Sequence, residues 1–324
     1  MGLKLRMWIL VALLFGALYG LITGVGTYLN IGNVVSYIVL AVVFLGIQYL
    51  VGPYLVSMMM KVKYVSESEE PELHQMVAEL SRRAGIPKPK VGISQISIPN
   101  AFAFGKTQAD GRVCITQGIR KLLNKDELKA VIGHEISHLK HRDMIIITLL
   151  SIVPLIFYWV AQGILWGGTS GNRKDSGSLG GLVGIGAMGV YFISNLLVLY
   201  GSRIREYYAD EGSVKIGNSP HRMASALYKL AYASSQVGVN GKGNEELRRI
   251  QGFRALLLND TSQGWREVRQ LKELDRDSDG AINQNDLLAL RSKEIRLGPS
   301  ESLLEVFTTH PNMLKRVKRL ATLG

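Results

Sequence analysis

Residues 7–60 decide the class of this protein; they read MWILVALLFGALYGLITGVGTYLNIGNVVSYIVLAVVFLGIQYLVGPYLVSMMM and contain no Asp, Glu, Lys or Arg. As one helix, the stretch would measure about 80 Å, whereas the hydrocarbon core of a bilayer is about 30 Å thick. We therefore expect two membrane spans, near 7–29 and 34–58, with a turn at 30–33. A signal peptide does not fit, because its apolar region has only about 7–15 residues.

Two later stretches have the same apolar character. The third span is expected from Met144 to about Trp166 and the fourth from about Leu179 to Tyr200, with a polar linker at 172–175. Their length and lack of charge favour membrane helices over the alternative, a pair of helices buried in a large soluble core. The sequence thus predicts a mainly α-helical, multi-pass membrane protein with four transmembrane helices.

The positive charges beside these spans predict the orientation of the chain. Cytoplasmic segments carry an excess of Lys and Arg, and the turn at 30–33 carries none. Both termini and all soluble parts are therefore expected in the cytoplasm, on the inner side of the cell membrane. Arg173 and Lys174 oppose this orientation mildly. The basic and His residues that support it flank the other span ends: Lys4, Arg6, Lys61, Lys63, His141, Arg142, Arg203 and Arg205.

The composition excludes several classes of protein. A hydrophobic fraction of 47% excludes a disordered chain, and a single Cys excludes a scaffold held by disulfides. The net charge of +12 is expected to attract an anionic membrane leaflet. No basic stripe with interleaved aromatic residues is present, so no nucleic-acid partner is expected.

The spans divide the chain into parts 1–60, 61–143, 144–200 and 201–324. The second part is expected to be α+β and the last to be mostly helical. Asn124, followed three residues later by Glu127, predicts a capping box at the start of a helix that runs through His141. The other expected elements are a helix over 71–84, strands over 90–96, 98–104 and 113–116, a hairpin turn at 105–111, and helix breaks at 217–220 and 237–243.

The capped helix carries a metal-binding pattern, His134-Glu135-Ile136-Ser137-His138. Residues four apart project from one face of a helix, so the imidazoles of His134 and His138 can bind one cation. Glu135 is turned aside and can hold a water molecule on the same metal. His141 is expected to be exposed or interfacial and not to be a ligand.

A catalytic zinc ion needs a third protein ligand and one open position for water. Glu206 follows the fourth span, on a helix expected to return beside the start of the third, and Asp210 lies one turn further on the same face. A carboxylate is the better candidate, because no third His follows the HEISH pattern closely. Salt bridges to Arg203 and Arg205 are the competing interpretation of these two acids, and spacing alone does not decide between them.

HEISH, followed by SRIREYYAD at 202–210, resembles the HtpX-type membrane metalloproteases, which are relatives of the prenyl-protein endopeptidases. PNAFA at 99–103 is similar to that family's substrate-binding edge strand. His310-Pro311 with Arg316 is similar to its C-terminal His-Pro motif. Because the four-span topology is also similar, the resemblance covers nearly the whole chain.

The resemblance implies a zinc metalloendopeptidase with a cytoplasmic, zincin-like peptidase domain and one Zn²⁺ per chain. His134, His138 and Glu206 would bind the zinc ion and Glu135 would be the general base. Asp210 would orient a ligand imidazole. Two further roles are implied: His310 would stabilise the oxyanion, with a structural role as its alternative, and Arg316 would be structural.

The expected substrate-binding residues are Asn100, Ala101, Phe102 and Ala103, to which an extended peptide would add as a strand. An ordinary core strand is the alternative. Main-chain recognition has little sequence preference, which suits quality control of unfolded or membrane proteins, with a link to stress response. Processing of prenylated proteins is the alternative within the same class.

A second metal motif, DRDSDGAINQND at 275–286, matches the EF-hand loop, with Asp at positions 1, 3 and 5 and Gly at position 6. Asp replaces the usual Glu at position 12, which would weaken Ca²⁺ binding, and a solvated turn is the alternative. The loop looks like an insertion, and bound Ca²⁺ would stiffen region 244–300. The expected calcium ligands are Asp275, Asp277, Asp279, Ala281, Asn283 and Asp286.

Two functions of other classes compete with the protease. One is a membrane scaffold that binds zinc structurally, and the other is a Ca²⁺-responsive binding protein. An open fourth position on the metal and the presence of Glu135, which has no structural task, argue against the scaffold. A single EF-hand-like loop gives the second competitor little support.

Overall fold

The computed structural model describes residues 34–143, scattered positions between 145 and 161, residues 177–237, and residues 271–324 with gaps at 276, 278–279, 293–297, 299–302 and 304. The chain divides into two compact units, Met1–Gly52 with Ile145–Ser202 and Pro53–Met144 with Arg203–Gly324. The predicted first span, the linker at 172–175 and the break at 237–243 lie outside the described residues, apart from Val237 itself.

The first unit holds the apolar helices. Among the described residues, the segment Leu182–Lys215 of α7 (Gly177–Lys215) is long and apolar enough to cross a membrane. Helix α2 (Val34–Met59) covers the predicted second span, and the described positions of the third span between 145 and 161 are helical. Four membrane spans therefore stay a prediction, and α7 is the described helix that best fits such a span.

The second unit is built on a four-stranded sheet. Its strands are β1 (Val62–Tyr64), β2 (Lys90–Ser94), β3 (Ala101–Phe104) and β4 (Arg112–Thr116), in the order β1-β2-β4-β3. β2 pairs parallel with β4, and the other pairs are antiparallel. β2 and β3 were predicted with longer bounds, 90–96 and 98–104, and β4 with bounds one residue shorter, 113–116. β1 was not predicted, since three residues are too few to show an alternating pattern.

The two faces of the sheet bury different cores, because side chains alternate along a strand. Val91, Ala103 and Ile115 face the main core beneath α3 and α5. Phe102 and Cys114 face a smaller cluster, which is closed by residues at the end of α2. The second unit is thus a layered α+β structure, as predicted.

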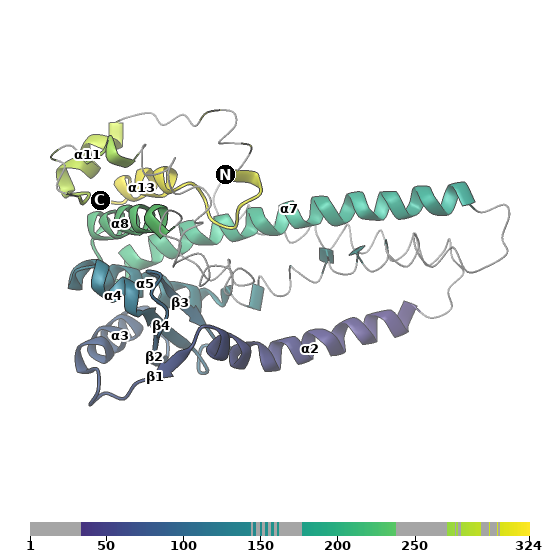
Figure 1. Ribbon diagram of the computed structural model, residues 1–324, viewed down its shortest axis with the longest axis horizontal. Coiled ribbons are helices and arrows are strands. Elements are labelled where there is room, and N and C mark those ends of the chain that lie inside the picture. Colours follow the sequence, from purple (N-terminus) through teal and green to yellow (C-terminus); the bar gives the residue numbers. More distant parts are fainter. Residues whose placement is uncertain are drawn as a thin grey trace. The chain divides into compact units, whose positions relative to one another are not determined.

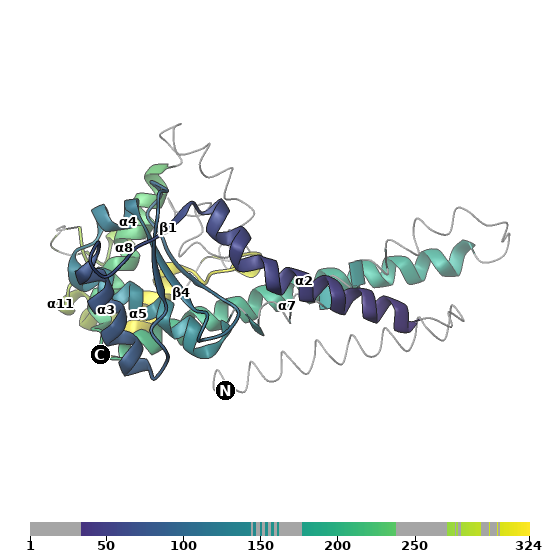
Figure 2. The same cartoon turned by 90° about the horizontal axis from the view of Figure 1, so that it is seen from below.

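Helices cover one face of the sheet in successive layers (Figures 1 and 2). α3 and α5 lie on the sheet, α8 packs on α5, and α11 and α13 pack on each other and on α8. The predicted helix over 71–84 and the break at 217–220 are confirmed. The helix bounds are α3 Pro71–Ala84, α4 Gln117–Leu122, α5 Lys125–His141, α8 Pro220–Val237, α11 Gln284–Ser292 and α13 Met313–Ala321.

Helix α5 begins and ends as its sequence dictates. Asn124 and Glu127 form the predicted capping box at its start. At its end, Arg142 adopts a left-handed conformation with φ 56°, which turns the chain back toward the helix. Gly212 permits the close approach of α7, because a Cβ there would lie 2.0 Å from the Ser137 Oγ atom. This approach brings the end of α7 beside the HEISH residues.

Candidate metal centre

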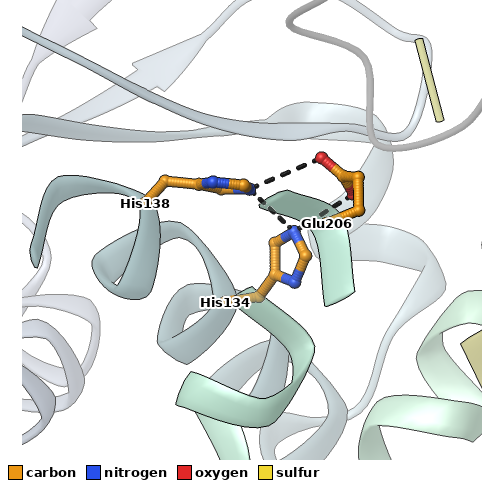
Figure 3. Close-up of side chains that lie close together, drawn as sticks. All are labelled: His134, His138 and Glu206. Atoms are coloured by element: carbon orange, nitrogen blue, oxygen red, sulfur yellow. Dashed lines mark hydrogen bonds and ion pairs between the residues drawn. The ribbon is translucent and has the colours of Figure 1, made fainter. Parts of the chain in front are cut away.

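His134, His138 and Glu206 converge at the crossing of α5 and α7 (Figure 3). One ligand atom from each residue lies within 4.8 Å of the others. The two Nε2 atoms are 3.0 Å apart, and the carboxylate oxygens of Glu206 lie 3.5 Å from His134 Nε2 and 3.6 Å from His138 Nε2. His134 and Glu206 are buried, so the cluster is largely shielded from solvent.

A carboxylate partner faces the second nitrogen of each imidazole. Nδ1 of His134 lies 2.9 Å from Oδ1 of Asp210, and Nδ1 of His138 lies 2.6 Å from Oδ2 of Asp143. In the neutral rings, these partners place the proton on Nδ1, which leaves each Nε2 lone pair facing the carboxylate of Glu206. Two imidazole nitrogens and a carboxylate that converge within this distance can bind a cation, and this set of nitrogen and oxygen ligands suits zinc.

Two buried arginines hold the acidic residues in place. Arg316 is fully buried, donates to both oxygens of Asp210 at 2.9 and 2.7 Å, and lies 3.0 Å from Oε2 of Glu206. Arg205 pairs with Asp143. The cation between Glu206 and Asp210 is therefore Arg316, and the competing pattern of salt bridges to Arg203 and Arg205 does not describe them.

Burial and neighbouring charges shift the pKa values of the three clustered residues. Burial and the charge of neighbouring His134 lower the pKa of His138 to about 4, which keeps this ring neutral. Burial acts in the same direction on His134, but hydrogen bonds to Asp210 and Glu206 outweigh it and raise the pKa to about 9. Although burial opposes ionisation of Glu206, the charges of His310 and Arg316 hold its pKa well below the ordinary value. The raised pKa of His134 favours a proton on this ring, which a metal ion would have to displace.

Glu135 lies between the cluster and the edge of the sheet. It is 4% exposed, and burial raises its pKa. A backbone hydrogen bond from Ala103 in β3 partly offsets that effect. A carboxyl group with a raised pKa beside candidate metal ligands is suited to accept a proton and return it during a reaction.

The predicted substrate strand is an edge strand whose side chains belong to the core. In the described part of the sheet, β3 has β4 as its one neighbour. Asn100 accepts a hydrogen bond from Thr116 of β4, so Ala101 and Ala103 direct their backbone groups to the open side. Phe102 is 1% exposed and packs in the smaller core cluster. The two competing interpretations of this strand are therefore compatible.

His310 approaches the cluster from the C-terminal segment. It is 7% exposed, and its Nδ1 atom lies 3.3 Å from Oε1 of Glu206. Its Nε2 atom has no hydrogen-bond partner among the described residues. His141, by contrast, is exposed as predicted.

Sequence reasoning missed Asp143 and the position of Arg316. Asp143 follows the HEISH helix by five residues, and it reaches His138 only because Arg142 ends the helix in a left-handed turn. An acidic residue directly after such a helix was the available signal. Arg316 was expected to be structural, but nothing in its own segment shows that it contacts two acidic residues about one hundred positions earlier.

The calcium-type loop shows local order around its first and last positions. Gly280, with φ 80°, donates its N–H to Asp275, and Asn283 and Asp286 cap α11 reciprocally at 3.1 and 3.0 Å. Asp277 accepts from the Asn283 side chain. Asp279 lies outside the described residues. Among the described residues, no metal-type cluster forms here.

Comparisons with known proteins agree with this geometry. A family model described as Peptidase family M48 matches residues 67–323. A protein named "Protease HtpX homolog" from Methanothermobacter thermautotrophicus is 55% identical over 235 residues, covering 72% of this chain and 88% of the relative. A protein of the same name from Pyrococcus abyssi is 40% identical over 237 residues, covering 72% and 81%.

Among solved structures, the crystal structure of S. mikatae Ste24p is similar to this chain, with a TM-score of 0.48 and 16% identity. The match covers 98% of this chain and 65% of that protein.

The family model and the relatives confirm the HtpX-type resemblance predicted from the four sequence motifs. The matched region contains both histidines of the HEISH pattern, Glu206 and His310. The chain therefore belongs to peptidase family M48.

Proposed function

We propose that this protein is a membrane-embedded, zinc-dependent endopeptidase that hydrolyses peptide bonds of misfolded or membrane proteins. The single observation that supports it best is the convergence of His134, His138 and Glu206 beside Glu135, under the open edge of β3. A structural zinc site does not need a buried acid with a raised pKa next to a free strand edge. The peptidase family supports the proposed reaction type, and the geometry supports the proposed residue roles.

In this proposal His134, His138 and Glu206 hold one Zn²⁺, with Asp210 and Asp143 orienting the two imidazoles. When bound, zinc supplies a Lewis acid that polarises a carbonyl and makes water more acidic. Glu135 takes a proton from the attacking water, whose oxygen bonds to the carbonyl carbon. The C–N bond then breaks, and Glu135 returns the proton to the leaving amine.

His310 is proposed to stabilise the negative charge that develops on the carbonyl oxygen. Its ring is buried with Nδ1 facing Glu206, and its Nε2 atom, which has no partner among the described residues, can donate toward a reacting group. Removal of one such donor typically costs 10²–10³-fold in turnover. A variant His310→Ala that retains zinc and loses activity to about that extent would support the role, whereas full activity would remove it.

The substrate is proposed to bind as an added strand on β3. Ala101 and Ala103 offer backbone groups on the open side, and this recognition does not depend on the substrate's side chains. The N–H of Ala103 now engages Glu135, so an incoming peptide would release that carboxylate for catalysis. Unfolded chains, which expose main-chain groups, are the fitting substrate class.

The localisation belongs to the same proposal. The apolar segment of α7 supports a membrane helix, and the basic residues at the predicted span ends support an active site that faces the cytoplasm. The multi-pass topology and this orientation are predictions. Protease accessibility of the C-terminus in inside-out and right-side-out vesicles tests them, since only inside-out vesicles should expose it.

The test of the function compares cleavage of an unfolded protein by the wild type and by Glu135→Gln in detergent with zinc. We expect cleavage to fall by 10²–10⁴-fold, the usual contribution of a general base. Glu72→Gln is the matched control, because Glu72 is exposed on α3 and remote from the cluster. Equal cleavage by the wild type and Glu135→Gln would exclude the proposed base.

Two other outcomes would favour the competing functions. If neither protein cleaves while zinc is bound stoichiometrically, the scaffold function takes precedence. If peptides are cleaved only when they carry a prenyl group, the protein processes prenylated substrates and does not perform general quality control. A link to stress response stays a prediction and would need expression measurements.

Binding of Ca²⁺ by the 275–286 loop also stays a prediction. The local order around Asp275 and Gly280 is compatible with an EF-hand loop and equally with a solvated turn. Calorimetry of the wild type with Ca²⁺, and of Asp275→Ala as its control, decides between them. Without a Ca²⁺-dependent heat in the wild type, the calcium-responsive function is excluded.

A further inference from the structure

The apolar stretch of α7 ends at a well-defined point. Residues 176–202 contain no charged residue, and Arg203 is the first. Residues 182–202 are long enough to cross the hydrocarbon core, which takes about 20 residues. Tyr200 is 37% exposed, and Tyr is typical of the membrane–water boundary. The membrane surface is therefore expected at the level of Arg203.

Arg203 attaches a distant segment of the chain at this level. Its Nη1 atom donates to the carbonyl oxygens of Val306 and Thr308, at 3.0 and 2.8 Å. Phe307 lies between these two anchored residues. The backbone of 306–308 is thus held at the end of the apolar stretch, only a few residues before His310.

In this segment the apolar side chains are exposed and the acidic side chain is turned inward, which is the reverse of an ordinary water-exposed surface. Leu303 is 63% exposed and Phe307 is 52% exposed, and residues four apart share one face of a helix. Glu305, between them, is turned inward, where it pairs with Lys315 and accepts the N–H of Asn312 at 3.1 Å. Apolar residues that face outward around an inward acid indicate a surface that contacts lipid or protein.

We propose that Leu303 and Phe307 insert into the headgroup region of the bilayer and anchor the His310 segment to the membrane surface. A lipid surface is favoured over a peptide because the segment is bonded to the residue at which the apolar stretch ends. Thr308 reinforces the connection, since its hydroxyl lies within hydrogen-bond distance of the carbonyl oxygens of Glu305 and His310, at 2.9 and 2.7 Å, and can donate to either. The bilayer surface thus fixes the position of the segment that carries His310 beside the candidate metal centre.

The test uses spin labels on the full chain in nanodiscs of phosphatidylcholine and phosphatidylglycerol. Phe307→Cys and, independently, Leu303→Cys introduce labelling sites. The native Cys114 is fully buried, so the unsubstituted chain gives the background. Leu288→Cys on α11 is the control, because Leu288 is 49% exposed but lies on a helix held by the far end of α13.

The control position is held farther from the expected membrane surface than the proposed anchor. Its helix α11 is bonded to α13, and Arg319 of α13 pairs with Glu211 on α7. Glu211 lies eight positions beyond Arg203, which corresponds to about 12 Å along the helix axis. We expect labels at 303 and 307 to relax faster with lipid-soluble oxygen than with a water-soluble nickel chelate. Their depth should be about 5–10 Å, typical of interfacial segments. The label at 288 should show the opposite preference.

Nickel-dominated relaxation at both 303 and 307, as at 288, would overturn the proposal. Protection from the nickel chelate that arises only after an unfolded protein is added would also overturn it and identify a peptide-docking surface. Labelling at two positions guards against one variant that fails to fold. Because the measurement does not depend on cleavage, its failure is distinguishable from failure of the proposed protease function.

Discussion

The HEISH cluster and the 275–286 loop are both candidate metal sites, but they are assembled differently. His134 and Glu206 come from two helices that are more than seventy positions apart, and Arg316 comes from a third. The candidate ligands of the loop lie within twelve consecutive positions. The HEISH cluster is buried and surrounded by charged partners, whereas the described side-chain contacts of the loop include its own hydrogen bonds and one that Tyr228 donates to Asp275.

This difference shows what a metal motif requires to become a metal site. Both stretches match a motif in sequence. Among the described residues, only the HEISH cluster has converging acceptors that are oriented by further residues, Asp210 and Asp143, each with its own arginine. Asp286 already accepts the N–H of Asn283 as a helix cap. The following predictions test this distinction.

Loss of a proposed zinc ligand should have the largest effect. In Glu206→Ala, the metal centre loses its only carboxylate ligand, and we expect zinc affinity to fall more than about 100-fold, beyond the cost of losing an orienting partner. Zinc content after dialysis, measured by mass spectrometry, reports it. Asp275→Ala in the loop is the matched control and should retain the zinc of the wild type. Equal zinc loss in both variants would contradict the assignment of the zinc site to the HEISH cluster.

Removal of the buried cation should strongly reduce stability. Arg316→Met leaves Glu206 and Asp210 buried without their partner, which typically costs about 3–5 kcal/mol of unfolding free energy. Urea-induced unfolding of the zinc-free chain in detergent measures it. Arg319→Met removes the partly exposed pair with Glu211 and should cost about 0–1 kcal/mol. A similar cost for both variants would contradict the assigned role of Arg316.

The orienting aspartates should have a smaller effect than the zinc ligands. Asp143→Asn removes the carboxylate that faces His138, and zinc affinity should fall about 10–100-fold. Competition with a fluorescent chelator measures this change. Asp110→Asn, which disturbs the Asp110–Arg112 pair of the β3–β4 hairpin, should leave the affinity unchanged. An unchanged affinity in Asp143→Asn would mean that the contact is only structural.

Zinc loading should release a proton at neutral pH. The pKa of His134 is raised to about 9, so the metal-free ring is protonated at pH 7 and must lose that proton to bind a metal. Calorimetry in buffers of different ionisation enthalpy should give about one proton from this ring at pH 7. Above pH 9 the release should disappear, because the ring is already neutral. Absence of release at pH 7 would contradict the assigned protonation state.

Calcium should have the smallest effect. If the loop binds Ca²⁺ with the weak affinity of extracellular modules, about 1 mM Ca²⁺ should stabilise the protein by about 0.5–1.5 kcal/mol. Asp275→Ala should abolish this shift in urea unfolding, and Asp286→Glu, which restores the usual residue at position 12, should enlarge it. A wild type that does not respond to Ca²⁺ would show that the loop is a solvated turn.

Local elements were predictable because their signals are local. The capping box of Asn124 and Glu127, the 71–84 helix and the turn before Pro220 each depend on residues a few positions apart. The two histidines of HEISH share a helix face for the same reason. Strand β1 was not predicted because three residues are too few to show an alternating pattern.

Contacts between distant segments were not predictable from spacing. Nothing near Arg316 indicates that it is buried between Glu206 and Asp210, and the resemblance to a family placed it only as structural. Asp143 depends on the left-handed Arg142, a conformation uncommon for residues other than glycine. These features arise when tertiary packing brings α5, α7 and α13 together.

X-ray absorption of the zinc-loaded protein tests the central claim most directly, since it reports the ligands of the metal itself. The account predicts two imidazole nitrogens from His134 and His138, an oxygen from Glu206 and no sulfur, with one imidazole lost in His138→Ala. His310, only 3.3 Å from Glu206, is the residue that could replace a predicted ligand. A spectrum with three imidazoles that falls to two in His310→Ala would contradict the account.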